Sequence, residues 1–514
     1  MMRRIKGSAL AKSCVSVLKS IWSDIRFPYS TPLKEAPMET HDPQRTRDAD
    51  IVIVGGGAGG LELAVRLAKA GHKDILLIDR DTSHVWKPRL HEIAAGLGRR
   101  QVDELGYAGL AEQWGFRYEC GTLASVEPEQ RQITLAAIPG GEDHASAEVP
   151  ARVRGYRQLV LALGGVTPDM GVEGVLEHAC LLDSPDDAER IAQQFSRGLL
   201  ANHVAMETAP TGDAGVSATQ GGAQVGAEGS TQDSAKESPG RPYQVVIVGS
   251  GATGVELAAY LHEARGMHDA PAPKGAKVEI TILEATETFM PGVTQELRES
   301  IHQRLEEQGI KIELSRQVAK VSSGSVEISE GDESVTRDAD LVVWAAGRVG
   351  PAIVEEIDAL ESNKKRQFTV TPGLQCLGHD SIFALGDCAN IDEAPLPPTA
   401  QVASEQAEFL ADELPRRQQG EPAQAFEFKD RGTLLSLSSA GSVGELSGKL
   451  SDKLGNAQGS KGNDDLQVRG RFARAAYQGL QRQHQFLLLG PLKGSAEVVS
   501  DVLRRSMGPR LKVH

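Results

Sequence analysis

The chain has 514 residues, enough for roughly two or three domains, each with a hydrophobic core. Its 70 acidic and 55 basic residues give a net charge of −15, which argues against nucleic acid as a partner because a phosphate-binding surface needs clustered Lys and Arg. The five cysteines are widely spaced, which indicates reduced thiols in a reducing compartment, and no metal site is predicted. No apolar run approaches the ~20 residues that cross a bilayer.

Residues 1–47 are predicted to be a basic extension outside the folded domains. No acidic residue precedes Asp24, and aliphatic residues recur at a spacing that would place them on one face of a helix. Three interpretations stay open: a disordered or misassigned start, a helix on a membrane surface, and an organelle transit peptide.

Residues 48–205 follow the order strand, glycine-rich turn, helix, strand, which is typical of a βαβ unit in an α/β fold. The turn contains Gly55, Gly57 and Gly60, a G-x-G-x-x-G fingerprint for dinucleotides. The first glycine allows a tight turn, the second lets the backbone approach a pyrophosphate, and the third lets the helix pack against the strand. The next strand ends at Asp79, about 20 residues further on, where a carboxylate can bind a ribose.

Residues 206–240 interrupt this fold. The stretch is rich in Gly, Ala, Ser, Thr and Gln and contains almost no large apolar residue. Such a segment cannot bury enough surface to offset its ordering entropy, so it is predicted to be a disordered, low-complexity loop.

Residues 241–339 repeat the βαβ pattern with Gly249, Gly251 and Gly254, and the next strand ends at Glu284. Two fingerprints imply two dinucleotides and therefore electron transfer between them. A carboxylate at this position can bind both ribose hydroxyls of NADH and repels the 2′-phosphate of NADPH. Since neither Arg nor Lys follows it directly, the sequence predicts NADH at the second fingerprint.

Residues 340–420 contain a short strand that ends in Gly386 and Asp387. This strand resembles the second flavin motif of flavoproteins with two dinucleotide-binding domains, in which the Asp contacts the ribityl chain of FAD. The resemblance assigns FAD to the first fingerprint. Residues 48–205 are then the first part of an FAD-binding domain, 340–420 are its second part, and 241–339 are an NADH-binding domain.

Three prolines then enforce an extended loop, after which Thr399 is expected to cap a helix over 400–414. Gln401 and Glu405 are four residues apart and so share one face of this helix. A helix N-terminus pointed at a flavin would supply positive potential for the charge that develops on the reduced ring.

Residues 421–514 are predicted to be a C-terminal, membrane-associating region. The part from residue 466 is basic in an otherwise acidic chain, and it contains clustered leucines over 486–489. Basic, aromatic and aliphatic residues together suit a helix in the interface of an anionic bilayer. The alternative is a C-terminal helix packed on its own domain or on a second subunit.

Several motifs in this chain resemble those of type II NADH:quinone oxidoreductases, and the resemblance covers residues 48–200 and 241–514. The motifs lie at residues 77–80, 84–88, 91–96, 161–164, 253–258, 344–347 and 397–403. No cysteine pair follows the first nucleotide-binding unit, which excludes a dithiol reductase and argues against sulfide:quinone chemistry.

The resemblance implies two Rossmann-like domains in a glutathione-reductase-like FAD/NAD(P)-binding fold, with an amphipathic C-terminal region that docks on a membrane. It places Gln401 and Glu405 at the quinone site and suggests that Glu256 couples nicotinamide binding to that site. The family has Gln in place of Glu405, and an ionised Glu cannot donate a hydrogen bond to a quinone oxygen. The further cofactor-binding residues that the resemblance implies are Lys87, Gly164, Gly347 and Gln401.

The expected function is transfer of two electrons from NADH through FAD to a membrane quinone, without proton pumping. The expected location is the cytoplasmic face of a prokaryotic plasma membrane, or the mitochondrial inner membrane if the extension is a transit peptide. Two alternatives are a soluble NADH-dependent ferredoxin or rubredoxin reductase and a redox sensor that binds FAD and NADH without turnover. A homodimer is left open.

Overall fold

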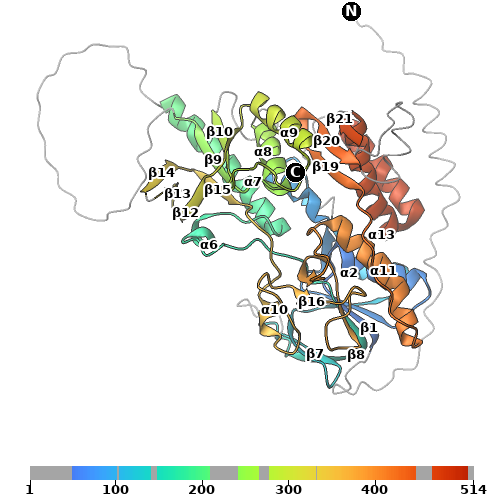
Figure 1. The fold of residues 1–514 in the computed structure, drawn as a ribbon. Coiled ribbons are helices and arrows are strands. Elements are labelled where there is room, and N and C mark those ends of the chain that lie inside the picture. The colour runs from blue at the N-terminus through green and yellow to red at the C-terminus, as the bar shows by residue number, and fades with distance from the viewer. Residues whose placement is uncertain are drawn as a thin grey trace, which may run out of the picture. The chain divides into compact units, whose positions relative to one another are not determined.

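The computed structural model describes residues 49–100, 104–140, 148–208, 241–265, 277–331, 333–446, 466–469 and 471–506. The predictions for the extension over 1–47 and for the loop beyond Thr208 lie outside these residues. Within them the fold is α/β, with two separate sheets that each carry one glycine fingerprint (Figure 1).

The first sheet holds the first fingerprint. Its strands, in order, are β5 (Arg117–Cys120), β2 (Ile75–Asp79), β1 (Ala49–Val54), β8 (Arg152–Leu161), β7 (Gln132–Leu135) and β6 (Leu123–Glu127), and β17 (Ile382–Ala384) pairs in parallel with β8. The sheet is mixed because β7 pairs antiparallel with β8 and β6. β1 pairs in parallel with β2 and β8 and is almost entirely buried, as the unbroken apolar run predicts for a strand covered on both faces. Helix α2 (Ala58–Lys69) follows the glycine turn.

The second sheet holds the second fingerprint. Its strands, in order, are β11 (Lys311–Glu313), β10 (Val278–Leu283), β9 (Tyr243–Val248) and β15 (Leu341–Trp344), all parallel. Helices α8 (Ala252–Ala264) and α9 (Gln295–Glu307) connect them, and β12 (Gln317–Ser322), β13 (Ser325–Glu330) and β14 (Glu333–Asp338) form an antiparallel sheet beside it. β15 was expected in the FAD-binding part, so the predicted boundary at residue 339 moves to the end of this strand.

Helix α7 (Pro185–Thr208) connects the two sheets and extends three residues into the segment predicted to be a loop. The shorter elements between residues 83 and 390 are β3 (Ser83–Val85), η1 (Lys87–Arg89), α3 (Leu90–Ala94), β4 (Glu104–Gly106), α5 (Tyr107–Trp114), α6 (Val175–His178), α10 (Ile353–Glu356), β16 (Phe368–Thr369), η2 (Gly386–Cys388) and β18 (Ala389–Asn390).

Helix α11 (Ala400–Gln418) lies beside α2, and the chain then forms β19 (Gly432–Ser436), η3 (Ser438–Ala440), β20 (Ser442–Leu446) and β21 (Leu466–Arg469) (Figure 1). Leu435, Leu437 and Val443 are buried in the same core as α8 and α9. This hairpin was predicted to be part of a membrane-associating region. It is part of the folded core because its apolar side chains face the second unit.

Helix α13 (Arg471–Ser506) contacts α2, β19 and β20, and Gly490 breaks it with a positive φ of 77°. Leu488 is completely buried in the hydrophobic core around the first sheet, and Leu489 packs against the same core. The apolar run over 486–489 was predicted to form a membrane surface, but it packs largely within the protein. Leu492, just after the break, is 87% exposed.

Candidate active site

The first glycine turn has the shape that a pyrophosphate requires. Gly55 has a φ of +104°, and a Cβ on Gly60 would lie 1.9 Å from the carbonyl oxygen of Gly55. A Cβ on Gly57, in contrast, would meet nothing within 4 Å. The first and third glycines therefore serve the turn and the packing, and the second keeps an open cradle in front of the helix.

The second glycine turn repeats this geometry. Gly249 has a φ of +107°, and a Cβ on Gly254 would lie 2.2 Å from the carbonyl oxygen of Gly249. A Cβ on Gly251 would again meet nothing within 4 Å. Both Gly57 and Gly251 are helix N-caps without a side-chain cap, so the N–H groups of the first helical turn remain available to phosphate oxygens. Both turns fit a dinucleotide.

Asp79 lies at the end of β2, where the sequence places it. Its Oδ2 accepts a hydrogen bond from the backbone N–H of Gly56 at 2.5 Å, and its Oδ1 accepts one from the N–H of Asp81 at 2.8 Å. Burial raises the pKa of Asp79, and these hydrogen bonds oppose that increase. The carboxylate thus holds the glycine turn through the N–H of Gly56.

Glu284 occupies the corresponding position after β10. Its Oε2 accepts hydrogen bonds from the N–H and hydroxyl of Ser250, at 3.0 and 2.7 Å, and its Oε1 accepts two from Thr286 at 3.0 Å. Burial alone would raise the pKa of Glu284, but these hydrogen bonds outweigh it and hold the pKa below the usual value. The group is therefore anionic at neutral pH. Arg316 donates its backbone N–H to the carbonyl of Glu284, while its guanidinium pairs with Glu330.

Asp387 lies in η2, directly after β17, and makes ionic contacts that the sequence did not indicate. Arg348 donates from Nε to Asp387 at 3.1 Å and from its terminal nitrogen to Asp183 at 3.1 Å. Burial lowers the pKa of Lys87, and the charge of Arg348 lowers it further, whereas Asp183 and Asp387 oppose the shift. These residues fit the ribityl and ring region of FAD.

Gly164 and Gly347 both lie in turns with positive φ, 68° and 79°. A Cβ on Gly164 would meet nothing within 4 Å, whereas one on Gly347 would lie 3.4 Å from Met170 and Pro168. Gly347 immediately precedes Arg348, so the turn places this arginine beside Asp387.

The N-terminal turn of α11 packs against both halves of the FAD site. Thr399 caps the helix as expected, because its hydroxyl accepts the N–H of Val402 at 3.2 Å. The backbone N–H of Gly386 donates to Gln406 Oε1 at 2.7 Å. A Cβ on Gly59, in the first turn of α2, would lie 3.0 Å from the carbonyl oxygen of Ala403.

Gln401 and Glu405 lie side by side on this helix, as their spacing predicts. Gln401 Nε2 is 3.4 Å from Glu405 Oε1 and donates to the carbonyl of Lys429 at 3.1 Å. Glu405 accepts the N–H of Lys429 at 3.0 Å, and its carboxylate lies 3.1 Å from Arg431 Nε. The Glu405 carboxylate is therefore paired within the protein.

Glu256 is buried where α8, α3 and β19 meet. Its Oε1 accepts the N–H of Ser436 at 2.9 Å, and its Oε2 lies 3.4 Å from His91 Nδ1. Burial raises the pKa of Glu256 to about 8 and lowers the pKa of His91 to about 4. Both groups are therefore neutral at pH 7. His91 falls within a motif noted in the sequence, but Ser436 comes from the tail and carried no signal.

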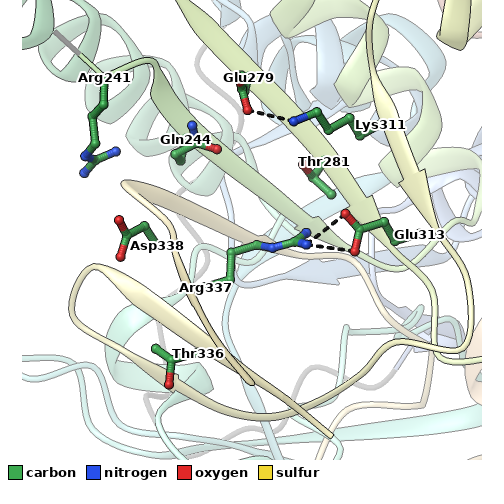
Figure 2. A pocket seen from close by; sticks show the side chains of 9 residues that line it. All are labelled: Arg241, Gln244, Glu279, Thr281, Lys311, Glu313, Thr336, Arg337 and Asp338. Atoms are coloured by element: carbon green, nitrogen blue, oxygen red, sulfur yellow. Dashed lines mark hydrogen bonds and ion pairs between the residues drawn. The ribbon is translucent and has the colours of Figure 1, made fainter. Parts of the chain in front are cut away.

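A separate cavity of about 380 Å³ lies on the face of the second sheet that β14 covers (Figure 2). None of the predicted site residues lines it. Four of its charged groups form two pairs, Lys311 with Glu279 at 2.9 Å and Arg337 with Glu313 at 2.8 Å. This cavity is distinct from both glycine turns.

Two dinucleotide cradles with carboxylates in the ribose positions define an FAD- and nicotinamide-dependent oxidoreductase. The sequence profile of the family described as pyridine nucleotide-disulphide oxidoreductase matches residues 49–407, and the chain belongs to this family. Within it, the chain belongs to the type II NADH:quinone oxidoreductases. It is 33% identical to the type II NADH:quinone oxidoreductase of Haemophilus influenzae over 90% of this chain and 100% of that protein.

One more relative and two solved structures are also similar to this chain. The type II NADH:quinone oxidoreductase of Staphylococcus aureus is 26% identical over 78% of this chain and 90% of that protein. The fold is similar to that of NDH2 from Plasmodium falciparum in complex with NADH, with a TM-score of 0.69 at 16% identity over 91% of this chain and 100% of that one. The sulfide:quinone oxidoreductase of Aquifex aeolicus is also similar, with a TM-score of 0.63 at 15% identity over 90% of this chain and 96% of that one.

The family membership and the two cradles together confirm the predicted fold class, the cofactors FAD and NADH, and electron transfer from NADH to a quinone. Within the described residues, no helix is both long and apolar enough to cross a membrane.

Proposed function

We propose that NADH binds at the second glycine turn with its ribose on Glu284, and that the quinone binds at the N-terminal turn of α11 beside Gln401 and Glu405. The observation that carries this proposal is the packing of α11 against both halves of the FAD site. Gly386 donates to Gln406, and Gly59 approaches Ala403. A quinone at this turn would therefore lie next to the flavin.

FAD, when bound, supplies the chemistry of accepting a hydride and passing two electrons to a quinone. The protein supplies position and charge. The cradles at Gly57 and Gly251 hold the two pyrophosphates, and Asp79 and Glu284 hold the riboses. Lys87 and Arg348 bring positive charge to the flavin site beside Asp387. In the balanced reaction, NADH, one proton and a quinone yield NAD⁺ and a quinol.

The contacts of the Glu405 carboxylate suggest a reason for a Glu at a position where the family has Gln. Its carboxylate holds the 429–431 segment through the N–H of Lys429 and the guanidinium of Arg431. The donor that faces a quinone oxygen is then the guanidinium of Arg431, or the amide of Gln401 once it exchanges its 3.4 Å hydrogen bond to Glu405 for one to the quinone. The glutamate itself need not donate a hydrogen bond.

The quinone is lipid-soluble, and we propose that α13 beyond Gly490 docks on the membrane surface. Leu492 and Val499 are seven residues apart on this segment, and both are exposed. Lys493 and the arginines at the chain end supply positive charge for an anionic bilayer. The cytoplasmic face of a prokaryotic plasma membrane stays the proposed location.

Gln401→Ala tests the quinone site. We expect the KM for a ubiquinone analogue to rise about tenfold from the loss of one hydrogen bond. The rate at which NADH reduces the flavin, followed by stopped-flow absorbance, should not change, because the proposed NADH site lies at the second glycine turn. Asp412→Asn, at an exposed position of the same helix, is the matched control. An unchanged KM in Gln401→Ala would exclude this site.

A further inference from the structure

A chain of hydrogen bonds runs through the interior from the first glycine turn to the C-terminal helix. It starts at the carbonyl oxygen of Gly56 and passes through His84 and His484 to Glu62. His84 and His484 are 400 residues apart in sequence, and both are buried. None of these four residues is among the predicted site residues.

The direction of each hydrogen bond follows from its acceptors. The carbonyl of Gly56 can only accept, so His84 Nδ1, at 3.0 Å, carries a proton. Burial, followed by the charge of His484, lowers the pKa of His84 to about 3, so its ring is neutral and its Nε2 accepts. His484 Nε2, also at 3.0 Å, is therefore the donor.

The opposite side of His484 faces a carboxylate. His484 Nδ1 lies 2.6 Å from Glu62 Oε1, while Ser404 of α11 donates to Glu62 Oε2 at 2.6 Å. Burial would raise the pKa of Glu62, but the hydrogen bond and charge of His484, with Ser404 and Arg66, outweigh it and lower the pKa. Both nitrogens of His484 thus donate, one to His84 and one to Glu62.

The ring of His484 also stacks on Trp86, with centroids 4.0 Å apart and an interplanar angle of 33°. His84 and Trp86 belong to the motif at residues 84–88, which also includes Lys87. Neither of them has a role in the function proposed above. His84 and Trp86 together hold the imidazole ring of His484, one through a hydrogen bond and the other through a ring contact. These contacts fix the orientation of the ring, so that its two nitrogens face their acceptors.

The hydrogen-bond chain ends at Gly56, in the glycine turn where we expect FAD to bind. Gly56 is held through both of its backbone polar groups, since its N–H donates to Asp79 and its carbonyl, in the Gly56–Gly57 peptide, accepts from Tyr107 at 2.8 Å and from His84. A Cβ on Gly56 would collide with the Tyr107 ring at 2.5 Å. Rotation of the Gly56–Gly57 peptide would reorient the N–H of Gly57, which lies at the cradle.

We propose that His484, on the C-terminal helix, is a positioning residue for FAD: through His84 it holds the Gly56 peptide in the orientation that the pyrophosphate cradle requires. The helix that carries it is then part of the cofactor site. This inference depends on the use of FAD and not on where the quinone or the membrane binds.

The test is a double-mutant cycle on FAD affinity. The four proteins are the wild type, His84→Ala, His484→Ala and the double variant, and each is stripped of flavin and titrated with FAD by fluorescence. We expect the dissociation constant to rise about tenfold in each single variant, because one hydrogen bond to the peptide is lost or misdirected. The double variant should be no weaker than His84→Ala, because His484 acts through His84.

Gln483→Ala, at an exposed position of the same helix, is the matched control and should bind FAD as the wild type does. If His484→Ala does not fold, His484→Gln replaces it, since the amide fills a similar volume but cannot donate from both sides. An unchanged FAD affinity, or effects that multiply in the double variant, would overturn the proposal. Quinone reduction is not measured, so a failure of the proposed quinone site leaves this result unaffected.

Discussion

At the scale of single residues, the two nucleotide units place the same chemical group in different surroundings. Asp79 accepts two backbone N–H groups, whereas Glu284 is fully engaged by the backbone and hydroxyls of Ser250 and Thr286. The longer side chain reaches a shell of donors that keeps it ionised. We expect this charge to discriminate against the 2′-phosphate of NADPH.

Glu284→Gln should weaken this discrimination. We expect kcat/KM for NADH to fall about tenfold through the loss of charge-assisted hydrogen bonds to the ribose, while kcat/KM for NADPH stays level or rises. Glu279→Gln on the same strand, where Glu279 pairs with Lys311, is the control. The ratio of the two kcat/KM values, measured with one quinone analogue, decides the matter, and an unchanged ratio would remove Glu284 as the selecting group.

Glu256 should make the free energy of unfolding depend on pH. Its pKa rises from 4.5 to about 8 on folding because of burial, so the folded protein holds a proton that the unfolded chain releases. The contribution of the neutral carboxyl to stability is therefore complete below pH 4.5 and is lost as the pH rises to about 8. Chemical unfolding from pH 5 to 9 should show a shallower decline in Glu256→Gln than in the wild type.

Glu287→Gln, at an exposed position of the same unit, should follow the wild-type curve. His91 acts in the opposite sense. Its pKa falls from 6.5 to about 4 on folding, so its penalty grows only as the pH drops below 6.5. A Glu256→Gln curve parallel to that of the wild type over the whole range would contradict the assignment of a neutral Glu256.

At the scale of elements, α13 is held where it breaks. The carbonyls of Leu487, Leu488 and Leu489 accept hydrogen bonds from Lys69, Trp114 and Gln113, at 2.6, 2.7 and 3.0 Å. These are the last carbonyls before Gly490, which an uninterrupted helix would bond internally. Side chains of α2 and α5 thus cap the first half of α13 and fix the direction of the second half.

Trp114→Phe should loosen this cap. The indole N–H bonds the carbonyl of buried Leu488, so its removal leaves an acceptor unpaired and costs about 1–3 kcal/mol. The remaining ring still packs against Lys69, whose ammonium lies 4.2 Å from the indole centroid. We expect a lower midpoint of thermal unfolding and faster hydrogen exchange over 484–490. Equal exchange in both proteins would show that the cap does not hold the break.

At the scale of the whole molecule, the tail both completes the core and presents an exposed segment. β21 pairs with β20, His484 contacts the first glycine-turn network, and Leu488 lies in the first core. Among the tail side chains that the structure describes, the large apolar ones that are exposed, Leu492 and Val499, lie beyond Gly490. The two roles divide at the break in α13.

Two truncations should separate these roles. Removal of residues 466–514 should abolish stable folding and FAD retention because it removes internal groups, whereas removal of 491–514 should leave both intact and release the protein from anionic vesicles. Flavin absorbance of the purified proteins and co-sedimentation with vesicles measure the two properties. Leu492→Glu should also reduce binding, and Gln483→Glu adds the same charge elsewhere on the helix as a control. Full vesicle binding by the protein that lacks residues 491–514 would refute docking through that segment.

The two glycine turns and the carboxylates that follow them could be predicted from the sequence, because their geometry is local. A glycine turn, the helix after it and a carboxylate at the end of the next strand lie within about 25 to 35 residues, and backbone sterics fix their arrangement. The same holds for the cap at Thr399 and for Gln401 and Glu405, which helical spacing alone brings together.

Only the tertiary structure decided the contacts between distant segments. Arg348 beside Asp387, Ser436 on Glu256, and His484 on His84 each join groups whose positions depend on how whole elements pack. The leucine run shows the reason most clearly. Its composition suits a membrane or a core equally well, and only the apolar surface around Trp114 and α2 settles that Leu488 is buried within the protein.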